Sequence, residues 1–302
     1  MAKILVNDGI SAEGEQILRD AGHELEMEKV PQENLKDELG KYNAILVRSA
    51  TKVRTEHIDA APDLKLIGRG GVGLDNIDVD YAKSKGIEIV NTPAASSASV
   101  AELVLSHMFA LSRHLIPANL TMRNGEWNKK QYKGVELDGK TLLIVGFGRI
   151  GQSLAGKAAA IGMKVIGYDI IDVETEYEFT KDLDGALGLA DYVSLHVPSQ
   201  KEYLVSEEFI AKMKDGAYLL NCARGGVMDE KAVVKALDDG KLAGLGVDVF
   251  EVEPATNTEL INHPKVSVTP HIGAATKEAQ ARVGLELATK VANFFAGKGA
   301  VA

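Results

Sequence analysis

The chain alternates short apolar runs with longer amphipathic stretches from its first residues onward. In the first part, the apolar runs that predict strands are residues 3–6, 44–48, 64–68 and 87–90. Helices are predicted between them. One begins after Ser11 and another at Thr55, because the hydroxyl side chains of these residues can cap a helix. Strands that alternate with helices are typical of a parallel, doubly wound sheet, so the first part predicts a small α/β domain.

A second alternation of strands and helices begins near residue 140. The predicted strands are 142–146, 164–169, 191–196, 217–221, 244–249 and 265–269, and the helices between them include 206–214 and 229–238. Six strands are the number in a complete dinucleotide-binding fold. The two alternations are separated by a long predicted helix at 99–115 and a loose polar stretch at 123–139.

The run LLIVGFGRIGQSLAGKAAAIG at 142–162 carries the clearest chemical pattern. After its strand, Gly146 permits a tight turn, Gly148 lets the backbone approach a pyrophosphate, and Gly151 lets helix and strand pack closely. The start of the helix offers free N–H groups and a positive dipole end to the phosphates. Asp169 ends the next strand, about 20 residues further on, where a ribose-binding acid belongs. The pattern predicts a dinucleotide site.

The residues around Asp169 predict NAD as the cofactor. A carboxylate at this place hydrogen-bonds the ribose hydroxyls and repels a 2′-phosphate. Ile170 and Ile171 follow it, so no adjacent arginine is available for NADP.

The final predicted helix runs from Thr276 to about Phe295, and no strand follows it, so it can return to the first domain. We predict an α/β fold with two doubly wound parallel-sheet domains. A Rossmann NAD-binding domain of residues 96–275 is inserted into a discontinuous, flavodoxin-like substrate domain of residues 1–95 plus 276–302. The last seven residues, AGKGAVA, are expected to fray.

Three polar residues, Arg224, Glu253 and His271, each follow one of the last three predicted strands. Ligands of an open parallel sheet bind outside the carboxyl ends of its strands, so we expect these residues at the edge where the nicotinamide lies. Glu251 is a second carboxylate in the same loop as Glu253 and competes for its role.

The chemistry of these side chains fits the transfer of a hydride between a nicotinamide and a 2-keto acid. A hydride that reaches a ketone leaves negative charge on the oxygen, which His271 can protonate. A carboxylate such as Glu253 orients the imidazole and stabilises its charged form. The planar fork of Arg224 can hold the substrate carboxylate and polarise the adjacent carbonyl group.

Two arginines of the first domain, Arg48 and Arg69, also lie at the carboxyl ends of predicted strands. With Arg224 on the carboxylate, we expect them to bind a phosphate group across the cleft, which favours 3-phosphoglycerate over lactate or glycerate. The alternative is that either arginine only pairs with a nearby carboxylate. The segment GRGGVG at 68–73 is interpreted as a flexible turn, because its glycine spacing differs from that of a Rossmann turn.

Segments throughout the chain resemble the D-2-hydroxyacid dehydrogenase family, and within it the D-3-phosphoglycerate dehydrogenases. The matching segments are LVRSATKV (46–53), GRGGVGLDNID (68–78), NTP (91–93), AEL (101–103), GKTLLIVGFGRIG (139–151), GYD (167–169), NCARGG (221–226), DVFEVEP (248–254) and PHIGAATKEAQ (270–280). The resemblance implies NAD-dependent oxidation of D-3-phosphoglycerate to 3-phosphohydroxypyruvate in serine biosynthesis, by a short form without a C-terminal regulatory domain. It also implies a homodimer that associates through the 99–139 segment.

The resemblance assigns roles to individual residues. It implies that Arg224, Glu253 and His271 are the catalytic trio. Together with the glycine pattern, the expected cofactor contacts are Val72, Gly146, Gly148, Arg149, Ile150, Gly151, Asp169, His196, Val197, Pro198, Cys222, Ala223, Arg224, Asp248, His271, Gly273 and Ala274. The expected substrate contacts are Arg48, Arg69, Gly70, Gly71, Arg224 and His271. Val197 stands where the phosphoglycerate dehydrogenases commonly have threonine, so a hydroxyl contact to the cofactor is lost there.

The composition of the chain argues against several other classes of protein. The net charge of −9 and pI of about 5.4 argue against a nucleic-acid partner. No secretion signal follows Met1, and no apolar run reaches the roughly 18 residues of a membrane span. The single cysteine, Cys222, fits a reducing compartment, and no Cys/His cluster has zinc spacing, so we expect a cytoplasmic protein without a metal. Cys222, His107 and His114 are interpreted as packed or solvated residues without a catalytic role.

Two alternatives to the phosphoglycerate reaction stay open. One is a glyoxylate or hydroxypyruvate reductase, or another dehydrogenase of the same family. The other is a non-enzymatic protein that senses NAD(H), since family relatives serve as transcriptional corepressors. Hydride transfer separates the second from any enzyme, and the choice of substrate separates the enzymes from one another.

Overall fold

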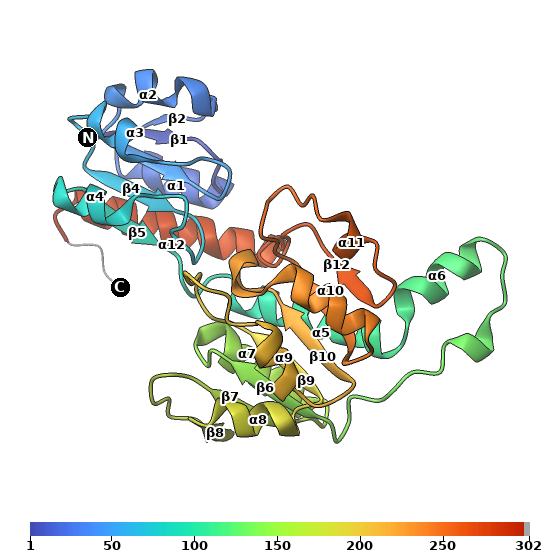
Figure 1. Ribbon diagram of the computed structural model, residues 1–302. Coiled ribbons are helices and arrows are strands. Elements are labelled where there is room, and N and C mark those ends of the chain that lie inside the picture. The colour runs from blue at the N-terminus through green and yellow to red at the C-terminus, as the bar shows by residue number, and fades with distance from the viewer. Residues whose placement is uncertain (299–302) are drawn as a thin grey trace. The chain divides into compact units, whose positions relative to one another are not determined.

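The computed structural model describes residues 1–298 of the chain (Figure 1). These residues form two compact units. One joins Met1–Ser96 with the chain from Ala274 onward, and the other is Ser97–Gly273. Of the tail predicted to fray, residues 299–302 lie outside the described part. None of the described helices combines the length and apolar character needed to cross a membrane.

The first unit is built on a five-stranded parallel sheet. Its strands are β1 (Lys3–Val6), β2 (Glu24–Glu26), β3 (Ala44–Val47), β4 (Leu66–Arg69) and β5 (Glu88–Asn91). Its helices are α1 (Ala12–Asp20), α2 (Leu35–Glu38), α3 (Thr55–Asp59), α4 (Val79–Ser84) and α12 (Lys277–Phe295). The order β2-β1-β3-β4-β5 confirms the flavodoxin-like prediction. The sequence does not predict β2, because this three-residue edge strand has no fully buried side chain and so leaves no apolar run.

Alternate residues of each strand enter two different cores of this unit. In β1, Ile4 and Val6 pack in the core beneath α1 and α12, whereas Leu5 packs in the core with α2, α3 and α4. α12 lies against α1 and contacts β4 and β5, so the final helix does return to the first part of the chain. The helix pair is close: a Cβ atom built on Gly14 would lie 2.7 Å from the carbonyl oxygen of Gly284.

The second unit contains a seven-stranded parallel sheet. Its strands are β6 (Thr141–Val145), β7 (Lys164–Tyr168), β8 (Glu178–Thr180), β9 (Tyr192–Leu195), β10 (Ala217–Asn221), β11 (Leu242–Val247) and β12 (Val266–Val268). The order is β12-β11-β10-β9-β6-β7-β8. All six strands predicted for this part are present in the Rossmann arrangement, with the direction of winding reversing between β6 and β9. The addition is β8, a short edge strand without a buried run.

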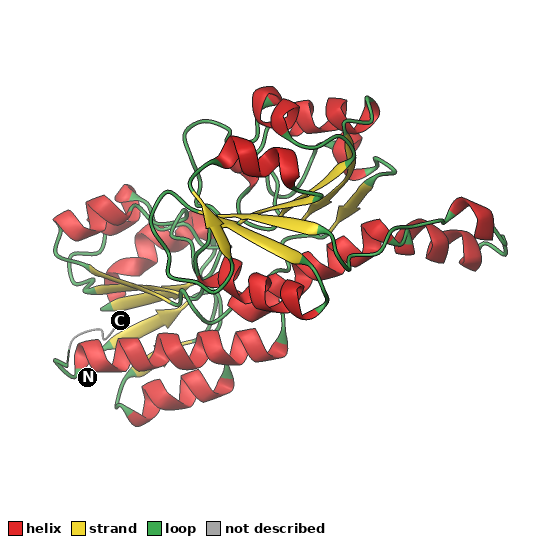
Figure 2. Ribbon diagram, turned by 90° about the horizontal axis from the view of Figure 1, so that it is seen from below, coloured by secondary structure: helices red, strands yellow, loops and turns green. Residues whose placement is uncertain are grey.

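Helices cover both faces of this sheet. Figure 2 shows the strands of each unit in yellow, with red helices on either side of them. The helices are α5 (Ser97–Ser112), α6 (Leu115–Arg123), α7 (Arg149–Ala160), α8 (Leu183–Leu189), α9 (Glu207–Lys212), α10 (Glu230–Asp238) and α11 (Thr258–Ile261). In β6, Leu142 and Ile144 face the core with α5 and α7, and Leu143 and Val145 face the core with α8, α9 and α10.

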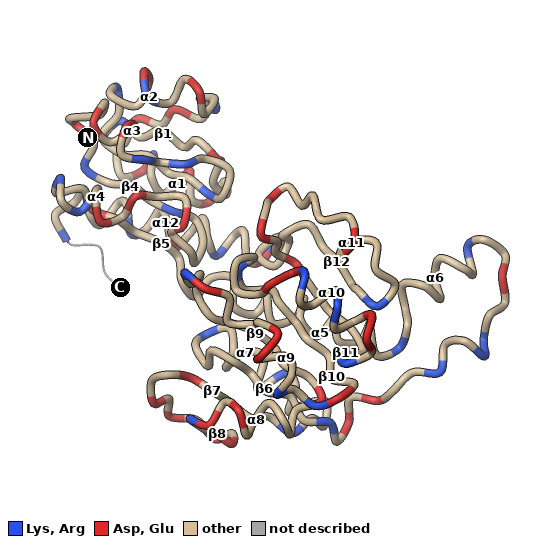
Figure 3. The backbone as a smooth tube through the Cα atoms, viewed as in Figure 1, with Lys and Arg blue, Asp and Glu red and all other residues tan. Residues whose placement is uncertain are grey.

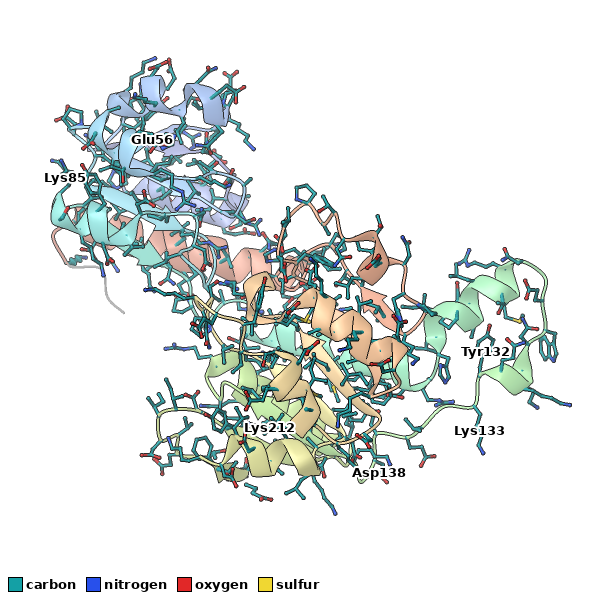
Figure 4. All side chains as sticks on the ribbon, viewed as in Figure 1. Glu56, Lys85, Tyr132, Lys133, Asp138 and Lys212 are labelled. Carbon is teal, nitrogen blue, oxygen red and sulfur yellow. The ribbon has the colours of Figure 1, made fainter. Side chains whose placement is uncertain are left out.

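The prediction of a helix over 99–115 is wrong at its C-terminal end. The helical conformation is interrupted between α5 and α6 at His114, which has a φ of 52°. The carbonyl oxygen of Ser112, which a continued helix would use internally, accepts a hydrogen bond from Val135 N at 2.9 Å. The returning chain therefore replaces the next helical turn. Residues 115–136, which we call the arm, project from the second unit, with Tyr132 on them and Asp138 where they rejoin the sheet (Figure 4).

Because the contact between Gly14 and Gly284 leaves no room for a methyl group, Gly14→Ala should destabilise the protein by about 1–3 kcal/mol, although alanine favours helices. The measurement is the thermal unfolding temperature. The control is Gly188→Ala in α8, where a Cβ atom would meet no atom closer than 4.0 Å. We expect this control to unfold at or above the wild-type temperature, and the same result for Gly14→Ala would contradict the packing argument.

Candidate functional site

The glycine turn after β6 has the geometry of an anion site. Gly146 has a φ of 92°, and a Cβ atom there would lie 2.6 Å from the carbonyl oxygen of His196. A Cβ atom on Gly151 would lie 2.5 Å from the Gly146 carbonyl oxygen, so both positions require glycine. Gly148, in contrast, faces open space and begins α7 without a side-chain cap. The N–H groups of Arg149 and Ile150 at this helix start are therefore available to a phosphate.

Asp169 has a second task that the sequence pattern does not reveal. Its Oδ2 accepts a hydrogen bond from Phe147 N at 2.8 Å, and its Oδ1 accepts one from Ile171 N at 3.3 Å. The predicted ribose acid thus also fixes the middle of the glycine turn. Ile170 beside it is 84% exposed.

His196, Val197 and Pro198 follow β9, next to the glycine turn of β6. Burial lowers the pKa of His196 to about 4, so its imidazole is neutral. Its Nε2 contacts Ser194 Oγ at 2.9 Å, while its buried Nδ1 has no hydrogen-bond partner among the described residues. The neutral imidazole is thus enclosed at the end of β9, beside the glycine turn.

The segment after β10 contains Cys222 and Ala223, both buried. Burial, together with the charge of Asp248, raises the pKa of the Cys222 thiol. The thiol is therefore neutral, which fits a packed residue and not a nucleophile.

The structure brings Glu253 and His271 together. His271 Nδ1 lies 2.7 Å from Glu253 Oε2, while Glu253 Oε1 accepts a hydrogen bond from Phe250 N at 3.2 Å. With Nδ1–H donating to the carboxylate, Nε2 is the nitrogen left to exchange a proton with a substrate. The two side chains are 43% and 38% exposed, so a small molecule can reach the pair.

The competing carboxylate, Glu251, is occupied elsewhere. Its Oε1 accepts a hydrogen bond from Glu230 N at 3.1 Å, and Glu251 N donates to Glu230 Oε1 at 2.9 Å. This reciprocal pair ties the loop after β11 to the start of α10. Of the two glutamates, only Glu253 has a contact with His271 among the described residues.

Arg224 follows β10, the strand that pairs with β11. Its carbonyl oxygen accepts a hydrogen bond from Asn221 Nδ2 at 3.0 Å, and its Nη1 donates to Ala223 O at 2.6 Å. Both bonds hold the half-buried arginine close to the strand end. The trio thus follows three neighbouring strands, β10, β11 and β12, as the sequence predicts.

Asp248, at the end of β11, is a buried acid with several backbone partners. Its carboxylate accepts hydrogen bonds from Ile272 N and Gly273 N, both at 2.8 Å. It also accepts one from Thr269 Oγ1 at 2.6 Å. Thr269 is absent from the residues that the sequence singles out, because a threonine at a strand end has no distinctive spacing.

In the first unit, the loop after β3 is held from both sides. Asp8 Oδ2 accepts hydrogen bonds from Arg48 N at 2.7 Å and Thr51 N at 3.1 Å. Asn76 Nδ2 donates to the carbonyl oxygens of the same two residues, both at 2.7 Å. Asp8 and Asn76 thus fix the loop that carries Arg48. The sequence patterns do not identify these two residues, and the only signal for either is the position of Asp8 just after β1.

The two predicted phosphate-binding arginines differ in their surroundings. The Arg48 guanidinium has no ion-pair partner within the described part of the chain, against the alternative of a local pair. The Arg69 side chain folds back over Gly71, whose Cβ position its guanidinium fills. Gly70 lies beside the Arg48 side chain, and Val72 accepts a hydrogen bond from Asn91 Nδ2 at 2.7 Å.

Acidic and basic residues are interspersed along both units, so local cations decide where an anion binds (Figure 3).

Comparisons with known proteins agree with this geometry. Residues 105–273 match the family model for the NAD binding domain of D-isomer specific 2-hydroxyacid dehydrogenases. The chain is 46% identical to hydroxypyruvate reductase from Thermotoga maritima, over 96% of this chain and 97% of that protein. It is 42% identical to D-3-phosphoglycerate dehydrogenase from Methanocaldococcus jannaschii over 99% of this chain, but spans only 58% of that protein.

The fold also matches the crystal structure of D-lactate dehydrogenase from Aquifex aeolicus complexed with NAD and lactic acid. The TM-score is 0.85, the identity is 33%, and the match covers 98% of this chain and 96% of the other. The second unit is therefore an NAD-binding domain, and its open Gly148 and uncapped α7 fit the pyrophosphate of that cofactor.

The double role of Asp169 predicts a difference between two substitutions. Asp169→Asn keeps an oxygen that accepts from Phe147 N but loses the charge, whereas Asp169→Ala loses both. Both variants should raise the ratio of NADPH to NADH in kcat/KM, because neither repels a 2′-phosphate. Only Asp169→Ala should also weaken NADH binding strongly, by roughly tenfold for the loss of about 1.4 kcal/mol. Equal NADH dissociation constants for the two variants would show that the turn does not need the acceptor.

Proposed function

Because the chain belongs to the D-isomer specific 2-hydroxyacid dehydrogenase family, we propose that it is a reductase of small 2-keto acids, with hydroxypyruvate and glyoxylate as its substrate class. The observation that supports the chemistry is the 2.7 Å contact between His271 and Glu253 at the exposed end of the NAD-binding sheet. The product is the corresponding D-2-hydroxy acid.

In the proposed reaction, each member of the trio acts on a different part of the substrate. Arg224 holds the carboxylate and draws electron density from the adjacent carbonyl oxygen. When bound, NADH supplies the hydride that reduces the carbonyl carbon. His271 gives the proton on Nε2 to the oxygen, and Glu253 stabilises the imidazolium before that transfer. In the direction of oxidation, neutral His271 takes this proton back.

The preference for hydroxypyruvate and glyoxylate rests on similarity along the whole chain. The hydroxypyruvate reductase of Thermotoga maritima matches over 97% of its length at the higher identity. Arg69, moreover, packs over its own loop, which weakens the argument for a phosphate site that uses both arginines.

The second candidate is the interconversion of 3-phosphoglycerate and 3-phosphohydroxypyruvate. It is favoured by Arg48, whose guanidinium has no ion-pair partner in the described part of the chain and could bind a phosphate. The sequence-based preference for this reaction is therefore retained only as the alternative.

The test is NADH oxidation with hydroxypyruvate, glyoxylate, pyruvate and 3-phosphohydroxypyruvate side by side. We expect kcat/KM for hydroxypyruvate or glyoxylate to exceed that for the phosphorylated acid by at least about tenfold. His271→Gln should lower kcat by about 10²–10⁴-fold, since it removes the proton donor. The highest kcat/KM with 3-phosphohydroxypyruvate, and its loss in Arg48→Ala, would select the second candidate. No turnover with any of the acids would contradict both.

We further propose that two copies of the chain associate through the arm. The apolar side chains of the arm are between 41% and 78% exposed: Leu115, Ile116, Leu120, Met122, Trp127 and Val135. None of the α6 residues is buried, and within the arm Tyr132 Oη contacts Thr121 Oγ1 at 2.9 Å. Several exposed apolar side chains gathered on one projecting segment are typical of a protein interface.

A charge placed in the arm should separate the copies. We expect Leu120→Asp to shift the mass measured by light scattering from that of a dimer to the 32.3 kDa of one chain. The control is Leu189→Asp in α8, since Leu189 is also exposed, at 61% against 57% for Leu120, but lies off the arm. A wild-type protein that already has the mass of one chain would contradict the proposal.

A further inference from the structure

We propose that His107, Thr269 and Asp248 form a hydrogen-bonded relay that positions His271 for proton transfer. The role assigned to His271 rests on the proposed function. His107 and Thr269 touch no reacting atoms in this proposal and are positioning residues.

The relay begins at a buried histidine on α5. His107 is only 3% exposed, and α5 lies so close to β11 that a Cβ atom on Gly246 would be 2.7 Å from His107 Cβ. The two ring nitrogens both have partners on β12 and its end: Nδ1 lies 2.8 Å from Ser267 Oγ, and Nε2 lies 3.1 Å from Thr269 Oγ1. The ring thus bridges a helix and the strand that leads to His271.

The number of hydrogens fixes the direction of the relay. The carboxylate of Asp248 can only accept, so the single hydroxyl hydrogen of Thr269 is donated to Asp248 Oδ1, at 2.6 Å. Thr269 Oγ1 must then accept from His107 Nε2–H, and His107 Nδ1 accepts from the hydroxyl of Ser267. The network assigns the Nε2–H tautomer to His107. Burial lowers the pKa of His107 more than the charge of Asp248 raises it, which keeps the ring neutral as this pattern requires.

The relay ends at Asp248, which accepts hydrogen bonds from the backbone around His271. The carbonyl oxygen of Asp248 accepts a hydrogen bond from His271 N at 2.9 Å, and its carboxylate accepts from Ile272 N and Gly273 N. His271 has a φ of 54°, a left-handed conformation that costs about 1–2 kcal/mol in a residue other than glycine. The hydrogen bonds from three consecutive N–H groups to Asp248 hold the backbone in this conformation. The side chain is thereby aimed at Glu253.

A second anchor on the same helix supports this interpretation. Ser99 Oγ donates a hydrogen bond to the carbonyl oxygen of Gly273 at 2.6 Å. α5 therefore holds the His271 loop directly through Ser99 and indirectly through His107. If His107 only filled space, neither its two polar contacts nor their link to a carboxylate would be needed.

The experiment compares Thr269→Val with Thr269→Ser. Valine has the shape of threonine but no hydroxyl, so it breaks the link between His107 and Asp248, whereas serine keeps the hydroxyl. We expect Thr269→Val to lower kcat for the best 2-keto acid by about 10–100-fold, as a misplaced catalytic group does. We expect Thr269→Ser to restore kcat to within about threefold of the wild type.

The control for a purely structural effect is Ser112→Ala, which removes another buried hydrogen bond of α5, between Ser112 Oγ and Tyr192 Oη at 2.7 Å. Ser112→Ala should lower the unfolding temperature but leave kcat unchanged. A kcat for Thr269→Val that follows its unfolding temperature, as in this control, or no rescue by serine, would overturn the relay.

Nuclear magnetic resonance of the histidine rings gives a readout that does not depend on turnover. The wild type should show His107 protonated at Nε2, and Thr269→Val should shift the ring signals of His271 while Ser112→Ala should not. Absence of turnover in the wild type would count against the proposed function, and the ring signals would then decide the relay by themselves. A His107 ring protonated at Nδ1 would overturn the relay in either case.

Discussion

Parallel pairing of the strands is the constraint on which the proposed chemistry depends. Because β9, β10, β11 and β12 run in the same direction beside β6, their carboxyl ends meet at one edge of one sheet. The glycine turn, the His271–Glu253 pair and Arg224 all follow strands that end there. No loop has to reach far, and each functional side chain is attached within a few residues to the rigid sheet. The site is thus a property of the sheet edge, with the loops supplying only the last adjustment.

Most of this arrangement could be predicted from the sequence, because it depends on patterns that repeat locally. Apolar runs of four to six residues identified the long strands, and the spacing of Gly146, Gly148 and Gly151 identified the turn. The order of strands and the family then followed from the succession of the patterns. β2 and β8 could not be predicted, since a three-residue edge strand is held by pairing to its neighbour and needs no apolar run.

The parts that sequence could not supply are contacts between residues far apart in the chain. The end of α5 at Ser112 is determined by Val135, a residue that no helical pattern around position 112 contains. The choice between Glu251 and Glu253 depends on Glu230, whose backbone and side chain engage the first glutamate. The partners of His107 lie 160 and 162 residues further along the chain. The polar contacts of this buried histidine are therefore visible only in three dimensions.

The division of the chain also has a consequence for its synthesis. Ser97–Gly273 is continuous, so this unit can complete its core while the ribosome is still adding the residues that follow. The first unit cannot do the same, although its strands emerge earlier. The face of its sheet that carries Ile4, Leu46 and Leu66 is completed by Leu287 and Val291 of α12, which follow every strand of both units in the chain. The nascent protein thus holds an apolar sheet face without its final cover until the whole second unit has been made, and a chaperone that binds such surfaces would meet the first unit during that interval.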